Sequence, residues 1–271
     1  MLRQSIEIST IYDLFLYAIL AAMIISLVIT PSLFAQQSNS ISDSNNNNSI
    51  GGHTDVSCGD SIEGTVTLST DLNCTNGDGL RLESGAKLFL NGHSIRGPGI
   101  HGTNVGLDAV RVNNAVVQGP GTINNFKSRI LTTGVNSLKL SSIILRDNEI
   151  GLFVTDSGNF EINNNTIRNN NLGIAAHSSD GLNITSNTFN DNALSSITFV
   201  RTQTSSIGMN SINGSQNGVF TDAQSSQNTV KSNHFSNNVI DINNANGLQT
   251  NINSNSYSDN NCQFSNPSGL C

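Results

Sequence analysis

Apolar residues recur at a nearly constant interval in the second half of the chain. One column comprises Ile123, Leu145, Ile167, Phe189, Ile212, Phe235 and Tyr257, whose numbers rise in steps of 22, 22, 22, 23, 23 and 22. Two more columns keep this interval: Leu140, Ile162, Ile184, Ile207, Val230 and Ile252, and also Ile130, Leu152, Ile174, Ile197 and Val219. A repeat this short cannot bury its own apolar face, so successive copies are expected to stack.

The residues within each repeat predict strands. Short alternating runs such as Asn183-Ile184-Thr185 are bounded by Asn, Ser, Gly and Asp, and no run after position 56 keeps a helical period for ten residues. The pattern therefore predicts an all-β fold, a single-stranded right-handed parallel β-helix with about 22 residues per coil. Coils are expected about 4.8 Å apart, the spacing of neighbouring strands. Right-handedness follows from the general preference of parallel crossovers.

The period is less regular at the start of the array. Strands are expected around Ile62 to Leu68 and around Leu80 to Leu90. The step from Ile95 to Ile123 is longer than the usual step, which predicts an insertion around residues 101–107. Lengthened turns of a stacked fold often form the wall of a cleft, because only loops depart from the stack.

The N-terminal residues read as an export segment followed by a linker. A charge-free stretch from Leu14 to Thr30 follows Arg3, and Ala35 is a plausible cleavage point. We interpret residues 1–35 as a signal peptide, with an uncleaved membrane anchor as the alternative. Residues 36–55 are rich in Ser and Asn and predict a flexible linker, and residues 56–271 form the β-helix domain. Either interpretation places the domain outside the cytoplasm, secreted or at the cell surface.

Composition narrows the classes of partner. Only 11% of the residues are charged, and the net charge is −7. This balance argues against nucleic acid as a partner and against attraction to anionic lipid, so membrane contact is expected only through an uncleaved N-terminal segment. The many asparagines fit the turns of a stacked fold, where amide side chains form ladders. One such column is Asn148, Asn170, Asn192, Ser215, Asn238 and Asn260.

All four cysteines follow the export segment. Cys58 and Cys74 bracket the first predicted strand, and Cys262 and Cys271 close the last coil. In an oxidising compartment this placement predicts one disulfide at each end of the domain. Zinc is the alternative, but neither pair has C-x-x-C spacing and no histidine lies near Cys262.

The opening of the domain resembles a known group of proteins. The relevant residues are Cys58-Gly59-Asp60, Thr67-Leu68, Asp71-Leu72-Asn73-Cys74 and Leu90-Asn91-Gly92-His93-Ser94-Ile95. They resemble the start of secreted right-handed β-helix proteins, which include the copper-associated periplasmic accessory proteins of nitrous-oxide reductase maturation. The group is more distantly similar to the pectin-lyase-like enzymes. The resemblance covers residues 56–262 and implies fold and compartment more than activity.

Aligning the turns by the period yields one candidate catalytic constellation. Asp156, His177, Arg201 and Asp222 are expected on four successive coils that span about 14 Å. Two carboxylates, an imidazole and a guanidinium on one face are suited to deprotonating a uronic-acid sugar or cleaving a glycosidic bond. The alternative is a solvated column of turn residues. The Asn-Thr-Asp, Asp-Asp, Gly-His-Gly and Asp-Pro-His motifs of pectin-lyase-like enzymes are absent, which lowers the odds of an enzyme.

Metal and carbohydrate sites are poorly supported by residue type. A His93/His101 pair lacks further ligands nearby, Met209 is the one methionine beyond the export segment, and the cysteines are expected in disulfides, so we predict no metal site and no cofactor. Calcium becomes relevant only if the chain acts on polysaccharides. Aromatic platforms for sugars are also scarce, because the chain has no Trp. Sequons at Asn47, Asn73, Asn164, Asn183 and Asn213 are candidate glycosylation sites.

Three functional hypotheses remain open. We favour an exported, non-catalytic β-helix protein that interacts with glycans or other cell-envelope partners, because the stack is uniform and carries few charges. The second is a polysaccharide lyase, hydrolase or epimerase that uses the four-residue constellation. The third, based on the resemblance alone, is an accessory protein in metal-centre assembly.

Overall fold

The computed structural model describes residues 56–247 and 254–271 of the chain. The predicted export segment (1–35), the predicted linker (36–55), Asn47 and Ile252 lie outside these residues. Across the described ranges, no helix is long and apolar enough to cross a membrane.

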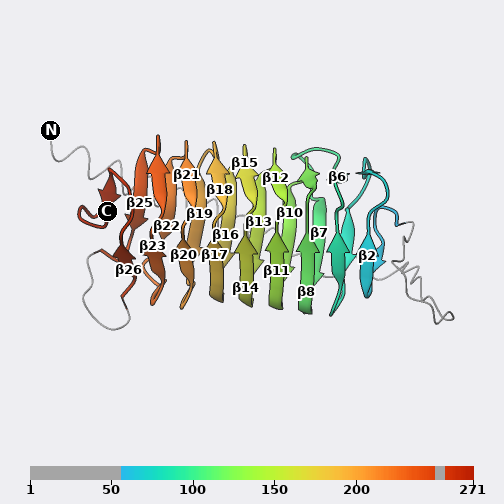
Figure 1. Ribbon diagram of the computed structural model, residues 1–271, viewed down its shortest axis with the longest axis horizontal. Coiled ribbons are helices and arrows are strands. Elements are labelled where there is room, and N and C mark those ends of the chain that lie inside the picture. Colours follow the sequence, from blue (N-terminus) through green and yellow to red (C-terminus); the bar gives the residue numbers. More distant parts are fainter. Residues whose placement is uncertain (1–55, 248–253) are drawn as a thin grey trace. The chain divides into compact units, whose positions relative to one another are not determined.

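The described residues form short parallel strands in three sheets (Figure 1). The ten-stranded sheet, here sheet A, contains in spatial order β1 (Ser61–Ile62), β4 (Leu80–Leu82), β7 (Val105–Val110), β10 (Ser128–Thr133), β13 (Ile150–Thr155), β16 (Leu172–His177), β19 (Ser195–Val200), β22 (Asn217–Thr221), β25 (Ile240–Asn244) and β27 (Ser265–Asn266). The nine-stranded sheet, sheet B, contains β2 (Thr65–Thr67), β5 (Lys87–Phe89), β8 (Asn113–Gln118), β11 (Asn136–Ser141), β14 (Gly158–Asn163), β17 (Asp180–Thr185), β20 (Ser206–Gly208), β23 (Thr229–Lys231) and β26 (Ser256–Ser258). The eight-stranded sheet, sheet C, contains β24 (His234–Ser236), β21 (Ser211–Asn213), β18 (Thr188–Asn190), β15 (Thr166–Arg168), β12 (Ile144–Arg146), β9 (Thr122–Asn124), β6 (Ser94–Arg96) and β3 (Leu72–Asn73).

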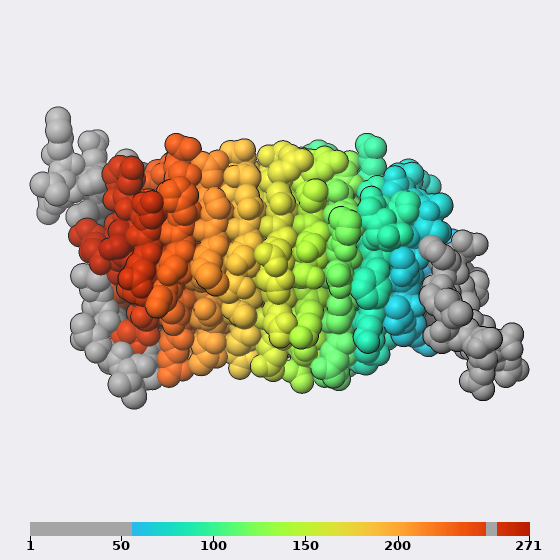
Figure 2. Space-filling model, viewed as in Figure 1, coloured from blue at the N-terminus to red at the C-terminus, as the bar shows by residue number. Residues whose placement is uncertain are grey.

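The order of strands confirms the predicted parallel β-helix. Each strand pairs with the equivalent strand of the neighbouring coil, and consecutive segments of the chain occupy consecutive bands of the stack (Figure 2). Ile130 pairs with Leu152, and Ile174 pairs with Ile197, so paired residues lie one period apart in the sequence. The hydrophobic period therefore measures the length of one coil.

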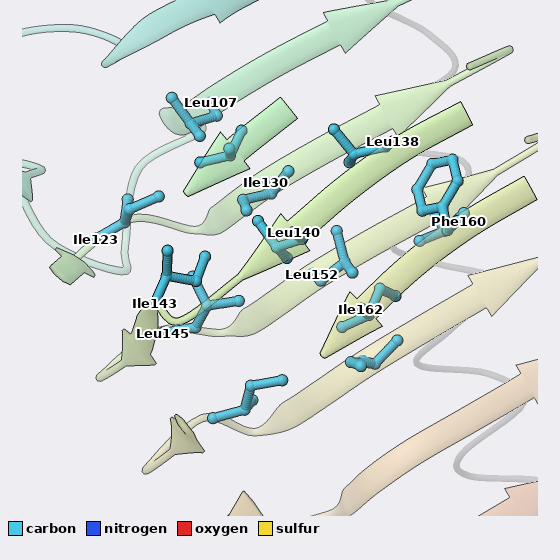
Figure 3. Packing of buried hydrophobic residues seen from close by; sticks show 14 of the residues in the cluster. Leu107, Ile123, Ile130, Leu138, Leu140, Ile143, Leu145, Leu152, Phe160 and Ile162 are labelled. Atoms are coloured by element: carbon cyan, nitrogen blue, oxygen red, sulfur yellow. The ribbon is translucent and has the colours of Figure 1, made fainter. Parts of the chain in front are cut away.

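The interior is filled by the predicted apolar columns. Leu107, Ile130, Leu140, Leu145 and Leu152 point toward one another from the three sheets (Figure 3), and each is fully buried. Stacked interiors of this kind bury one contiguous core along the coil axis, and each coil contacts chiefly its neighbours.

The last coil corrects the predicted register. Tyr257 pairs with Val230, not with Phe235, and belongs to the second apolar column rather than the first. Asn260 likewise accepts hydrogen bonds from Asn233, so it does not continue the column of Asn148. The reason is length: the step from Val230 to Tyr257 exceeds the usual period, so an unbroken period aligns this coil wrongly.

Two columns of asparagines lie in the turns and form hydrogen bonds between successive coils. Asn148 donates to Asn170, which donates to Asn192, in the predicted column. A second column, which the period did not single out, comprises Asn165, Asn187, Asn210, Asn233 and Asn260. Each amide bonds an amide of a neighbouring coil and also main-chain groups, so the amide groups of these columns are satisfied.

The two disulfides and the insertion near the start of the array lie close to their predicted positions. Disulfides join Cys58 to Cys74 and Cys262 to Cys271, as predicted. The insertion lies between β6 and β7, at residues 97–104, so it begins earlier than predicted and residues 105–107 belong to β7. On sheet B, Lys139 and Glu161 form an exposed ion pair at 3.0 Å, which contributes about 0–1 kcal/mol.

Candidate functional site

The outward faces of the three sheets differ in polarity. On sheet B, the paired residues Lys139, Glu161 and Asn183 point outward and are exposed. On sheet C, the outward residues include Thr166, Thr188 and Ser211. Polar side chains are expected wherever a sheet faces water. Sheet A departs from this rule, which makes its outward face the candidate functional site.

Apolar side chains occupy much of the outward face of sheet A. One outward column, defined by strand pairing, is Asp108, Leu131, Phe153, Ala175, Thr198, Phe220 and Asn243. A second is Val105, Ser128, Ile150, Leu172, Ser195, Asn217 and Ile240. The hydrogen bond from Asn243 Nδ2 to Asn217 Oδ1, at 3.0 Å, shows that the two columns share one face. Ile150, Phe153, Leu172 and Phe220 are buried, yet none belongs to the interior cluster.

Small residues separate two aromatic rings on this face. Phe153 and Phe220 lie three strand steps apart, about 14 Å at the usual strand spacing. Ala175 and Thr198 fill the two positions between them. These four side chains are each at most 2% exposed. We call these four residues, together with His177, the aromatic segment of sheet A.

Several buried polar atoms on this face have no hydrogen-bond partner. Within the described part of the chain they are Asp108 Oδ1, His177 Nδ1 and Thr198 Oγ1, and two further such atoms lie elsewhere. Thr198 pairs with Ala175, and His177 follows Ala175 by two residues on the same strand. His177 therefore lies diagonally from Thr198. A buried polar atom without a partner costs about 1–3 kcal/mol, so three on one face mark a place where a ligand gains by supplying partners.

Burial also affects the acid on this face. It raises the pKa of Asp108 to about 6, while the positive charge of Arg81 on the neighbouring strand opposes the rise. Asp78 and Glu83 add smaller effects in the same direction as burial.

Of the four predicted catalytic residues, His177 belongs to the aromatic segment, and the other three lie near it, so that the four occupy two adjacent columns. His177 pairs with Val200 on the outward face, and Asp222 follows Thr221, the partner of Phe199, so it continues the column of His177 and Val200. Asp156 and Arg201 occupy the adjoining turn, where both have left-handed backbone with φ of 48° and 51° and exposed side chains.

Asp222 serves the backbone of the turn. Its side chain is fully buried, and Oδ1 accepts hydrogen bonds from the backbone N–H of Arg201 (3.0 Å) and from both the N–H and the hydroxyl of Ser225 (2.8 and 2.6 Å). This carboxylate therefore stabilises the turn.

The imidazole of His177 is held toward its neutral form. Burial is the main cause that lowers its pKa, and the positive charge of Arg201 adds to it. The carboxylates of Asp156 and Asp222 act in the opposite direction. The charges of Arg201, Asp156 and Asp222 therefore act on the pKa of His177 from neighbouring positions. The catalytic role of the four residues stays a prediction.

Arg129 is a buried residue that the sequence pattern did not reveal. It stands in an inward column where neighbouring coils have Gly106, Gly151 and Gly173, and a Cβ on Gly173 would lie 2.4 Å from the carbonyl oxygen of Ser196. Its Nε donates to Asn148 Oδ1 at 2.5 Å and Nη2 donates to the Arg146 carbonyl, while Nη1 has no partner. Burial lowers its pKa well below the usual value. The one feature of the sequence that could have revealed Arg129 is an arginine at a position where neighbouring coils have glycine.

The described residues do not assemble a metal centre. No group of three His, Cys, Asp or Glu side chains in these ranges is placed to hold an ion. His93 Nδ1 lies 3.3 Å from Asp71, His234 Nδ1 lies 3.0 Å from the amide of Asn261, and Met209 is 64% exposed. His101, the other half of the pair considered from sequence, is exposed in the 97–104 insertion.

The sequons in the described residues lie at the surface. Asn73, Asn164 and Asn183 are exposed, whereas Asn213 is half-buried and accepts hydrogen bonds from Ser236 and Asn237. Their modification stays a prediction.

Comparison with known proteins gives one family and one structural likeness of note. Residues 76–269 match the family described as periplasmic copper-binding protein (NosD). No curated protein matches the sequence. Among solved structures, the chain is similar to the A-module of the mannuronan C-5 epimerase AlgE6 from Azotobacter vinelandii, with 14% identity and a TM-score of 0.39. That alignment covers 79% of this chain and 75% of the other.

Proposed function

The chain belongs to the family described as periplasmic copper-binding protein (NosD), and from this premise we propose that it is an exported, non-catalytic β-helix protein that binds a cell-envelope component along the outward face of sheet A. The observation that carries the proposal is the contrast between this face and the other two. Apolar side chains such as Phe153 and Phe220 project from sheet A on the side away from the interior cluster, whereas the outward positions of the other two sheets are mostly polar.

The unpartnered polar atoms support binding at the same face. Asp108 Oδ1, His177 Nδ1 and Thr198 Oγ1 are all buried there. A binding surface that combines a dry apolar area with a few polar atoms gains affinity from the first and selectivity from the second.

Two observations support a non-catalytic role. One carboxylate oxygen of Asp222 accepts hydrogen bonds from the backbone of its own turn. Asp156 and Arg201 belong to a column of turn residues with left-handed backbone. General acid–base catalysis needs side chains positioned at a reacting group, and turn capping explains Asp222 without one.

Export is supported by the disulfides and by the family description. Disulfides persist in oxidising compartments. All four cysteines of this chain are paired, in two disulfides. The family description specifies the periplasm. The described ranges offer no three-ligand group for copper, so the proposal assigns copper no role.

The test compares a double variant on the outward face of sheet A with a single variant on the outward face of sheet B. The exported protein is mixed with purified envelope polysaccharide and with purified envelope protein, and binding is measured by co-sedimentation. Phe153→Thr with Phe220→Thr is expected to weaken binding at least tenfold, because it removes the apolar face. Val116→Thr on sheet B is the matched control and is expected to bind normally. Equal binding by both variants would place the interaction elsewhere and contradict the proposal.

Catalysis is tested separately on uronic-acid polymers with and without calcium. The expected result is no product. Product that disappears in an Asp156→Asn/His177→Gln double variant would show an enzyme and overturn the non-catalytic assignment.

A further inference from the structure

We propose that Asn76 is a site of spontaneous main-chain modification, in which the Asn76-Gly77 peptide closes to a succinimide and then opens to isoaspartate. The site lies in the turn between β3 and β4 and makes no use of the binding face of sheet A. Because glycine has no side chain to crowd its backbone nitrogen, an asparagine cyclises most readily when glycine follows it. The chain contains five such dipeptides, which begin at Asn76, Asn91, Asn213, Asn217 and Asn246.

The reaction needs the chain and water alone. The backbone nitrogen of Gly77 attacks Cγ of Asn76, a C–N bond forms, and the side-chain nitrogen leaves as ammonia with the proton that the backbone nitrogen releases. Water then opens the ring at either carbonyl, which gives aspartate or isoaspartate, and no electrons are transferred. The step therefore requires a backbone N–H that is free to lose its proton and an asparagine side chain that is free to turn toward it.

The Asn76-Gly77 peptide meets both requirements. The side chain of Asn76 is exposed. Among the described residues, neither this side chain nor the Gly77 N–H has a hydrogen-bond partner. Where a glycine N–H is hydrogen-bonded, that bond must break before the nitrogen can attack, which lowers the reactive population by about two- to tenfold for one bond. Asn76 is free of this barrier.

The stack protects the other four dipeptides. Asn217 and Gly218 lie buried inside β22. The remaining three have a glycine N–H that donates to a main-chain carbonyl: Gly92 to Pro120 at 2.6 Å, Gly214 to Ser236 at 3.2 Å and Gly247 to Asn244 at 3.0 Å. Asn91 is the closest comparison, because it is exposed like Asn76 and differs in this hydrogen bond.

The modification falls beside the contact that holds the 97–104 insertion. Asp78 Oδ1 accepts hydrogen bonds from the Val105 N–H at 2.7 Å and from the Asn104 amide at 3.4 Å. Isoaspartate at position 76 adds one methylene to the main chain and one negative charge, two residues before this carboxylate. The change therefore alters both the length and the charge of the turn that carries Asp78.

The experiment incubates the folded, exported protein at mildly alkaline pH and follows all five asparagines by peptide mapping with mass spectrometry that distinguishes isoaspartate from aspartate. Asn76 is expected to convert at least about tenfold faster than Asn91, because the Gly92 hydrogen bond must open first. Gly77→Ala is expected to slow conversion at Asn76 strongly and to leave Asn91 unchanged, because the added methyl crowds the nitrogen. This variant should melt with the parent, since a Cβ on Gly77 meets no atom within 4 Å.

Unfolding is the control for the part that the structure plays. In reduced, denatured protein the five dipeptides should convert at similar rates, because hydrogen bonds no longer protect four of them. The assignment is overturned if Asn76 stays intact in the folded protein, or if Asn91 converts as fast as Asn76 there. It is also overturned if folding slows all five dipeptides by the same factor, since Asn76 would then be as protected as the others.

Discussion

The carboxylate of Asp222 stabilises the turn that holds Arg201: Oδ1 accepts the Arg201 backbone N–H at 3.0 Å. In the preceding turns the equivalent N–H groups of Asp156 and Ser178 bond the carbonyls of His177 and Val200 on the next coil. Asp222 thus replaces a main-chain acceptor with a side-chain oxygen. Its burial is explained by this role.

Removing this acceptor is expected to destabilise the stack. Asp222→Ala leaves the N–H groups of Arg201 and Ser225 without their side-chain partner, and we expect a loss of about 1–3 kcal/mol in the free energy of unfolding. Denaturant unfolding followed by circular dichroism measures it. Asp222→Asn keeps an oxygen acceptor and should lose less. An Ala variant as stable as the parent would show that the turn does not depend on this carboxylate.

Asp108 and Asp71 are expected to give opposite pH dependence. The folded pKa of Asp108, about 6, lies above the usual aspartate value of 3.8, so this group lowers stability as the pH rises from about 4 to 6. Asp108→Asn removes that loss and should stabilise the protein at pH 7 by about 3 kcal/mol, with no gain near pH 3.5.

The control for this prediction is a carboxylate with the reverse shift. The Ser94 backbone N–H and His93 lower the pKa of Asp71, so its contribution is present above pH 4 and is lost as the pH falls through the lowered value. Asp71→Asn should therefore reduce the melting temperature at pH 7 and not at low pH. Melting curves of both variants from pH 3 to 8 test the pair, and the same sign for both at pH 7 would refute the argument.

The second asparagine column is expected to be structural. Asn187 is 1% exposed; its Oδ1 accepts from the N–H and the amide of Asn165, and its Nδ2 donates to the Ile162 carbonyl and to Asn210. Asn187→Ala strands buried donors and an acceptor, so a loss of at least about 2 kcal/mol in unfolding free energy is expected. Asn183→Ala, at an exposed position on sheet B, should change stability by less than about 0.5 kcal/mol. Equal effects in the two variants would contradict a buried ladder.

The sequence was sufficient for the fold because its information is periodic. Ile130, Leu152 and Ile174 recur at the length of one coil, so alignment by period places them in contact without knowledge of the turns. Alignment by the period places Tyr257 in the wrong column, because the apolar pattern does not show that the coil ending there is longer than the others.

The candidate site was harder to predict, because the period does not tell inward from outward. Phe153 and Phe220 look like core residues in the sequence, and only the alternation around Leu152 and Val219 turns them outward. The charged residues Asp156 and Arg201 drew attention by type, and they lie in the turn next to the strands of the aromatic segment. The polar atoms that lack partners, such as Thr198 Oγ1, are visible only once side chains are placed.

Arg129 offers a test of whether a buried charge stabilises this fold. Its guanidinium is fully buried, Nη1 has no partner, and burial lowers its pKa well below the usual value. Desolvation of such a charge commonly exceeds what its hydrogen bonds return. Arg129→Met keeps most of the volume and removes the charge, so the free energy of unfolding is expected to rise by about 1–4 kcal/mol. Arg129→Lys keeps the charge and loses the bond from Nε to Asn148, so it should destabilise the protein instead. Denaturant unfolding of both variants at pH 7 makes the measurement, and a destabilised Met variant would show that the guanidinium bonds to Asn148 and Arg146 outweigh the cost of burying the charge.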